Sequence, residues 1–212
     1  MSEFTRLTGL SNLTDSLPSW VIMTDDPMRL KMLAAHWLQN ARILYELRGL
    51  LGYMGSYNSI DVALVSVGYG EACALMYMHD AVQLGARRVV YLGECIARKP
   101  DIMLREVIIA DSSDAELIKC ALNAAHKHSI KAIVRDVETN DRFFIPGTSV
   151  SCDIVDMASS VVAKFASDNH IAALSILTVS QNTATMEFME DHERQSRMND
   201  ASQLVFETIA AC

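Results

Sequence analysis

The sequence predicts an α/β fold, a single-domain three-layer sandwich in which a central mixed β-sheet is covered by helices. Short apolar runs alternate with segments of helical periodicity along the 212 residues, and polar or glycine-rich turns follow several of those runs. The length suits one domain with a sizeable core, and no linker, repeat or low-complexity stretch divides it. We therefore expect one domain over residues 1–212.

Strands are predicted where short apolar runs lie between turn residues. They cover residues 20–24, 45–48, 54–59, 61–67, 88–93, 106–110, 131–137 and 172–180. The second and third of these lie around closely spaced glycines, which predicts a strand pair. The others are buried runs, as expected of a sheet covered on both faces.

Helices are predicted where apolar residues recur every three or four positions. The first follows Asp26-Pro27, a capping residue and a first-turn proline, and places Leu30, Leu33 and Trp37 on one face. The predicted helices cover residues 27–40, 71–84, from a start within 112–116 to 128, 154–168, and 190–211.

Composition and charge exclude several classes of function. Half of the residues are hydrophobic and 21% are charged, which is typical of a soluble globular protein. No apolar run reaches the roughly 18 residues of a membrane span, and the N-terminus lacks the apolar core of a signal peptide, so we expect a cytoplasmic protein without membrane contact. The net charge of −8, without a basic cluster, argues against a nucleic-acid partner.

The cysteines predict neither a disulfide framework nor a metal site. There are five, they are scattered, and no C-x-x-C pair occurs. We therefore expect reduced, mostly buried thiols, no metal and no cofactor.

Ligands of such sheets bind at the carboxyl ends of the strands. Four segments lie there: residues 24–26, 68–70, 93–95 and 180–182. The Gly68-Tyr69-Gly70 turn lets a backbone approach a ligand, but it lacks the third glycine of a dinucleotide fingerprint, and a plain tight turn also explains it. The last strand ends at Gln181, an amide, which neither gives nor takes a proton at working pH.

Four stretches together resemble the hexameric, bacterial-type purine nucleoside phosphorylases, within the nucleoside phosphorylase and nucleosidase superfamily. They are VIMTDDPMRLKMLAAHWLQNA, LRGLLGYMGSY, the run through VGYGEACALMYMHDAVQLGARRVVYLGECIA, and the segment from Val155-Asp156-Met157 through LSILTVSQN to HERQSRMND. The resemblance covers nearly the whole chain. It implies attack on the sugar C1′ by phosphate, or by water in the nucleosidases, a glutamate on the sugar hydroxyls, and an acid at the purine.

The phosphate sub-site departs from the pattern of the family. Arg29 matches, as does Arg48, which the resemblance implies is lent to a neighbouring subunit. However, the first-strand glycine falls on Asp25, a central arginine on Tyr91, and a small hydroxyl residue on Glu94. Like charges about 4 Å apart cost roughly 1–4 kcal/mol, so we expect Arg29 and Arg48 to pair with the two carboxylates rather than with phosphate.

The sugar and base sub-sites depart as well. The glutamate on the ribose falls on Ala158, and the catalytic acid falls on Gln181. The remaining matches are base-binding positions. We expect substrate contacts from Tyr69, Phe143, Phe144, Met157, Ser180, Gln181 and Arg194, and we leave the catalytic residue open, with Glu94, Asp25 and Arg194 as candidates.

Three hypotheses follow from the resemblance. The leading one is a diverged relative without standard phosphorolysis that keeps a purine- or nucleoside-like pocket and an oligomeric scaffold. The second is a nucleosidase that uses Asp25 or Glu94 to orient water. The third is an active nucleoside phosphorylase. The partners expected are a nucleoside or base, and other subunits of a hexamer built as a trimer of dimers or of an active paralogue.

Overall fold

The computed structural model describes residues 7–196 and 199–212. Its eleven strands form one mixed sheet, whose main path runs β2-β3-β4-β1-β5-β10-β6-β7. The strands are β1 (Trp20–Thr24), β2 (Gln39–Leu47), β3 (Leu50–Tyr57), β4 (Ile60–Ser66), β5 (Arg88–Ala97), β6 (Val107–Ala110), β7 (Ala132–Arg135), β8 (Glu138–Thr139), β9 (Ile154–Asp156), β10 (Ala172–Asn182) and β11 (Glu187–Phe188).

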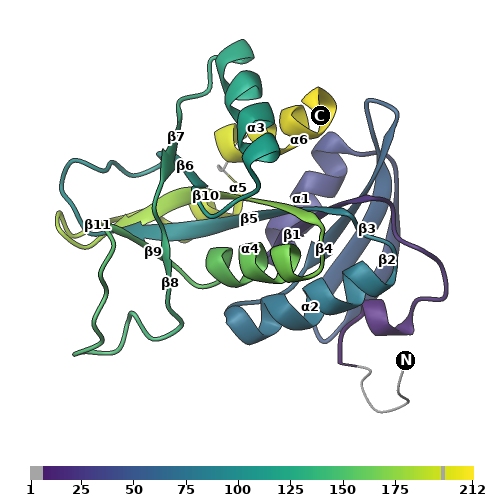
Figure 1. Cartoon of the computed structure of the whole chain (residues 1–212), viewed down its shortest axis with the longest axis horizontal. Helices are drawn as coiled ribbons and strands as arrows, with labels where there is room; N and C mark the ends of the chain where they lie inside the picture. Colours follow the sequence, from purple (N-terminus) through teal and green to yellow (C-terminus); the bar gives the residue numbers. More distant parts are fainter. Residues whose placement is uncertain (1–6, 197–198) are drawn as a thin grey trace.

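Helices lie on both faces of the sheet, which confirms the predicted three-layer α/β fold. Figure 1 shows α2 and α4 on one face, and α1, α3 and α6 on the other. The helices are η1 (Leu10–Asn12), α1 (Pro27–Trp37), α2 (Glu71–Gln83), α3 (Ala115–Lys127), α4 (Ser159–Asp168), α5 (Asp191–Ser196) and α6 (Asn199–Ala211). None of the helices in the described residues has the length and apolar character that a membrane span requires.

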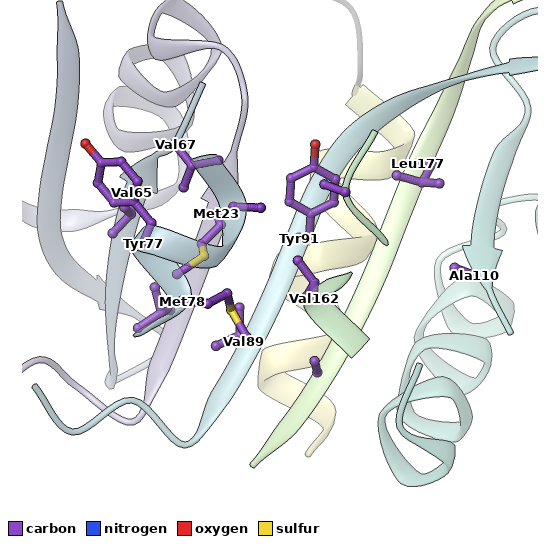
Figure 2. Packing of buried hydrophobic residues seen from close by; sticks show 14 of the residues in the cluster. Met23, Val65, Val67, Tyr77, Met78, Val89, Tyr91, Ala110, Val162 and Leu177 are labelled. Atoms are coloured by element: carbon purple, nitrogen blue, oxygen red, sulfur yellow. The ribbon is translucent and has the colours of Figure 1, made fainter. Parts of the chain in front are cut away.

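Each face of the sheet carries its own apolar core. Figure 2 shows Met23, Val89 and Tyr91 from neighbouring strands on one face, together with Val162 of α4. On the other face, Trp37 of α1 stacks on Phe206 of α6, with ring centroids 5.0 Å apart. The sheet is therefore buried on both sides, as continuous apolar strands require.

The centre of the sheet brings four strand ends to one edge. Strands β4, β1, β5 and β10 are mutually parallel, whereas β2 and β3 form an antiparallel hairpin beside them. The segments that follow β1 and β4, and the distal parts of β5 and β10, thus meet at the same edge. This is the edge that the sequence predicts for a ligand.

Several predicted boundaries are wrong. Residues 154–156 form β9, antiparallel to β5, rather than the start of a helix, and α4 begins only at Ser159. The strand pair 45–48 and 54–59 is in fact the longer hairpin of β2 and β3, with its turn at Arg48-Gly49. The predicted helix 190–211 is described as α5 and α6, with residues 197 and 198 between them outside the described residues.

The prediction that all cysteines are reduced thiols is also wrong. Cys120 of α3 and the C-terminal Cys212 form a disulfide, although 92 residues separate them in sequence. Helices α3 and α6 pack side by side, which brings the two residues together, and sequence spacing alone carries no sign of that packing. Cys73, Cys95 and Cys152 are free.

Candidate functional site

A cavity lies at the carboxyl edge of the central strands and encloses about 500 Å³ of space that is partly open to solvent. It is lined by Asp25, Tyr69, Tyr91, Glu94, Cys95, Ile96, Phe143, Val155, Asp156, Met157, Ser180, Gln181 and Arg194. Most of the site residues expected from the sequence are among these.

A chain of ion pairs occupies one side of this cavity. Arg29 of α1 donates from Nη1 to Oδ1 of Asp25 at 2.6 Å and from Nη2 to Oε1 of Glu94. Arg194 of α5 then donates from Nε to Oε2 of Glu94 at 2.8 Å. Two carboxylates thus alternate with two guanidinium groups, and the charges of these four side chains sum to zero.

The inner part of this chain is removed from water. The side chains of Arg29, Asp25 and Glu94 are 2%, 4% and 9% exposed, whereas that of Arg194 is 29% exposed. Arg29 Nη1 also contacts Oγ1 of Thr24 at 3.2 Å. Breaking a pair that is this buried leaves an uncompensated charge, which is costly.

Burial governs the protonation of Asp25. Desolvation raises the pKa of this carboxyl, the Arg29 charge opposes that rise, and the neighbouring Glu94 adds to it, with a net shift upward. Burial likewise lowers the pKa of Arg29, but Asp25 and Glu94 outweigh that effect, so its net pKa is raised and it stays charged. One buried, charged arginine, Arg29, therefore pairs with both carboxylates of the network.

Tyr91 fills the position at which the resemblance places an arginine. The side chain is 3% exposed, and burial, followed by the charge of Asp25, raises the pKa of its hydroxyl well above the usual range. Its ring lies across Gly93, where an added Cβ would stand only 2.5 Å from Cε1 of the tyrosine. The missing side chain at Gly93 therefore makes room for a neutral aromatic ring in place of a cation.

Asp156 lines the cavity but is occupied with the start of α4. Its Oδ1 accepts from Thr139 Oγ1 at 2.6 Å and Ser159 Oγ at 2.9 Å, and its Oδ2 accepts from the backbone N–H groups of Ser159 and Ala158. A carboxylate with four donors serves as a helix cap. Ala158 beside it is 1% exposed and offers no side-chain polar atom to a sugar.

The base-binding candidates lie on the opposite part of the lining. Gln181 and Ser180 come from β10, Met157 follows β9, and Phe143 lies in the loop after β8. Ser180 donates to the carbonyl of Cys95 at 3.4 Å. Within the described part of the chain, no hydrogen bond of the Gln181 side chain is found.

Two expected site residues lie elsewhere in this chain. Arg48 is exposed at the β2–β3 turn, so that within one chain Arg194, rather than Arg48, pairs with Glu94. Phe144 is 66% exposed and packs edge-on against Phe143 without lining the cavity. Tyr69, also expected, does line it, at 58% exposure.

Sequence reasoning missed Ile96, Val155 and Asp156 as lining residues, and it included Cys95 only within the strand-end segment 93–95. Ile96 and Val155 are partners in the pairing of β5 with β9, where the sequence predicts a strand that ends at residue 93 and a helix that begins at residue 154. The consecutive apolar residues 95–97 were the signal available for a longer β5. Among the described residues, no cluster of three His, Cys, Asp or Glu side chains suits a metal ion.

Comparison with known proteins gives a consistent set of relatives, although no family model matches the chain. It is 27% identical to a DeoD-type purine nucleoside phosphorylase of Bacillus velezensis, over 90% of this chain and 94% of that protein. The corresponding Bacillus subtilis protein is 26% identical, over 90% and 93%. A purine nucleoside phosphorylase of Toxoplasma gondii, solved with immucillin-H, has the same fold, with a TM-score of 0.83, 19% identity, and 92% and 91% coverage.

Replacing Arg29 by methionine tests the ion-pair chain. The variant leaves two buried carboxylates without their shared cation, and we expect a loss of about 3–5 kcal/mol in the free energy of unfolding near pH 7. Because the pKa of Asp25 is raised in the folded state, its charge costs stability as pH rises through that pKa. Loss of the Arg29 charge, which opposes that rise, raises the pKa further in the variant, so the deficit should shrink towards pH 5, measured by urea denaturation.

The matched control is Lys119→Met, which removes an exposed charge on α3 and should leave stability within about 0.5 kcal/mol of wild type. A deficit in Arg29→Met that is small, or that grows as pH falls, would contradict the network described above.

Proposed function

Since the chain belongs to the nucleoside phosphorylase superfamily, we propose that it is a diverged purine nucleoside phosphorylase-like protein that binds a purine base or nucleoside without standard phosphorolysis. The observation that carries this proposal is the pairing of Arg29 and Arg194 with Glu94. A phosphate dianion at this site would have to displace a carboxylate that already holds both cations. The desolvated negative charge of Asp25 would add further repulsion.

The proton donor and the sugar-binding carboxylate that the resemblance implies for the reaction are also absent. Gln181 cannot protonate a departing base, and general acid catalysis is typically worth 10²–10⁴-fold. Ala158 has no side-chain atom that could hydrogen-bond to the sugar hydroxyls. The carboxylate of the neighbouring Asp156 already accepts hydrogen bonds at the start of α4. The cavity itself, with Phe143 and Met157 in its lining, stays suited to a planar base.

Hydrolysis of an N-glycosidic bond is a second candidate. Asp25 lines the cavity, and burial raises its pKa towards the range of a general base. In this alternative, Asp25 would take a proton from a water that attacks the sugar, and no phosphate would be needed. The absence of a sugar-binding carboxylate at Ala158 weighs against it.

A base-release assay separates these functions. We expect no release from adenosine, inosine or uridine, with or without phosphate, beyond a rate about 10²–10⁴-fold below that of the Bacillus subtilis relative run in parallel. We also expect a purine base to raise the melting temperature, since a ligand bound only by the folded state stabilises it. Release that requires phosphate would overturn the proposal, and release without phosphate that Asp25→Asn abolishes would establish hydrolysis.

Substituting Glu94 by serine should create an anion site. This change frees Arg194 and one side of Arg29 while Asp25 still compensates the buried charge. We expect phosphate, compared with chloride at equal ionic strength, to raise the melting temperature of Glu94→Ser but not of wild type. Glu46→Ser, an exposed change on β2, should behave as wild type. Equal stabilisation of wild type by phosphate would show that its arginines are available after all.

We further propose a homo-oligomer, a hexamer built as a trimer of dimers, in which Arg48 approaches the cavity of a neighbouring subunit. The resemblance implies this arrangement, and the exposed position of Arg48 at the tip of a hairpin suits it. Native mass spectrometry should give six copies of the 23.4 kDa chain, and a monomer at micromolar concentration would contradict the proposal.

A further inference from the structure

The loop between β8 and β9 carries one wall of the cavity, although most of it lies in solvent. Phe143 of this loop lines the cavity, whereas the following Phe144 and Ile145 are exposed. The base of the loop is fixed, because Oε2 of Glu138 accepts from the backbone N–H and the hydroxyl of Ser151 at 2.6 and 2.7 Å. A loop this exposed keeps Phe143 in one position only if another contact holds it further along.

Asp141, two residues before Phe143, makes that contact. Its carboxylate accepts from the backbone N–H of Glu71, the first residue of α2, with Oδ1 at 3.2 Å and Oδ2 at 3.0 Å. Within the described chain, these are the hydrogen bonds found from residues 141–149 to any segment other than β8, β9 and their own loop. A negative group is also favoured electrostatically at the N-terminus of a helix.

The start of α2 lacks a cap of its own and receives this carboxylate from 70 residues away. The N-cap position is Gly70, which has no side chain to accept from the N–H groups of the first turn. The φ of Gly70 is +95°, and a Cβ built there would stand 2.9 Å from Oδ2 of Asp141. The glycine therefore shapes the turn and also lets the carboxylate reach the helix.

The contact between Asp141 and α2 joins two walls of the cavity. Tyr69, two residues before Glu71, lines the cavity as Phe143 does. The hydrogen bonds of Asp141 thus tie the turn that carries Tyr69 to the loop that carries Phe143. Because one residue separates Asp141 from Phe143, the place of the aromatic wall depends on this carboxylate.

We propose that Asp141 is a positioning residue for ligand binding, which latches the loop that carries Phe143 to α2 and so keeps the aromatic wall of the cavity in place. The inference rests on the purine-binding function proposed above, but it does not depend on the pose of the ligand. With the loop latched, Phe143 offers a preformed apolar surface, and binding does not have to order the loop. Without the latch, the apparent affinity falls with the fraction of molecules whose loop is closed.

Titration calorimetry with adenine compares two variants that each remove one helix-capping carboxylate. Asp141→Ala should weaken adenine binding roughly 2- to 30-fold, the factor to which one lost capping contact corresponds. Asp114→Ala is the matched control, because Asp114 caps α3 through the N–H groups of Glu116 and Leu117 and does not line the cavity. It should lower the melting temperature to a similar degree and leave the affinity as in wild type.

A conservative variant and hydrogen exchange test the latch itself. Asp141→Asn keeps a side-chain oxygen that can accept from Glu71, so it should bind adenine within about threefold of wild type. In the ligand-free protein, exchange should rise in residues 71–73 and 141–149 of Asp141→Ala, and in neither segment of Asp114→Ala. In wild type, adenine should slow exchange in both segments, a comparison that does not depend on the folding of a variant.

The outcomes separate the inference from the function on which it rests. If adenine does not bind wild type, the proposed purine-binding function fails and the inference fails with it. If adenine binds wild type and Asp141→Ala equally, or if Asp114→Ala weakens binding as much as Asp141→Ala, the inference alone is overturned and the purine pocket stands. The same holds if adenine binds wild type without slowing exchange in residues 141–149.

Discussion

The buried guanidinium of Arg29 is the interaction on which the site depends. A cation that is 2% exposed cannot stay charged in a protein core without partners, and Asp25 and Glu94 supply them. In the function we propose, the same carboxylates also disfavour phosphate in the cavity. The same four side chains therefore compensate one another's buried charges in the folded protein and make up the charged wall of the cavity.

Glu94 links the rigid and the peripheral parts of the site. It stands on β5 in the middle of the sheet, and it holds Arg194 of the short helix α5. A second pair fixes the same helix, because Arg105, in the loop before β6, donates two hydrogen bonds to Glu193. The wall of the cavity that α5 forms is thus held at two adjacent positions, by β5 and by the loop before β6, which favours a preformed pocket.

The fold and most of the lining could be predicted from the sequence, because both depend on local patterns. Apolar strand runs and the capping residue Asp26 can be recognised from neighbouring residues. In the structure, α1 begins at Pro27, directly after that cap. The errors arise where contacts between residues distant in the sequence determine the structure. Residues 154–156 are drawn into the sheet by β5, and Cys120 meets Cys212 only because α3 and α6 pack together.

The ion-pair chain illustrates the same limit at the level of single contacts. The resemblance of the sequence to the phosphorylases implies that carboxylates replace neutral residues at Asp25 and Glu94, and hence predicts that Arg29 pairs with them. It does not indicate that Arg194, 100 residues from Glu94, completes the chain in place of Arg48. That choice depends on where α5 lies, and α5 is positioned by tertiary contacts rather than by its own short sequence.

Neutrality also explains why the departures at the three sub-sites belong together. In the function we propose, no net positive charge holds phosphate, so a proton donor at Gln181 or a carboxylate at Ala158 would have no phosphate nucleophile to assist. Residues that act as one catalytic unit contribute non-additively, so restoring any one of them alone recovers little of the reaction. An amide and an alanine are then free to serve binding and packing. In the function we propose, a cavity that keeps its aromatic and amide groups, and has its charges paired internally, holds a neutral base and does not cleave a glycosidic bond.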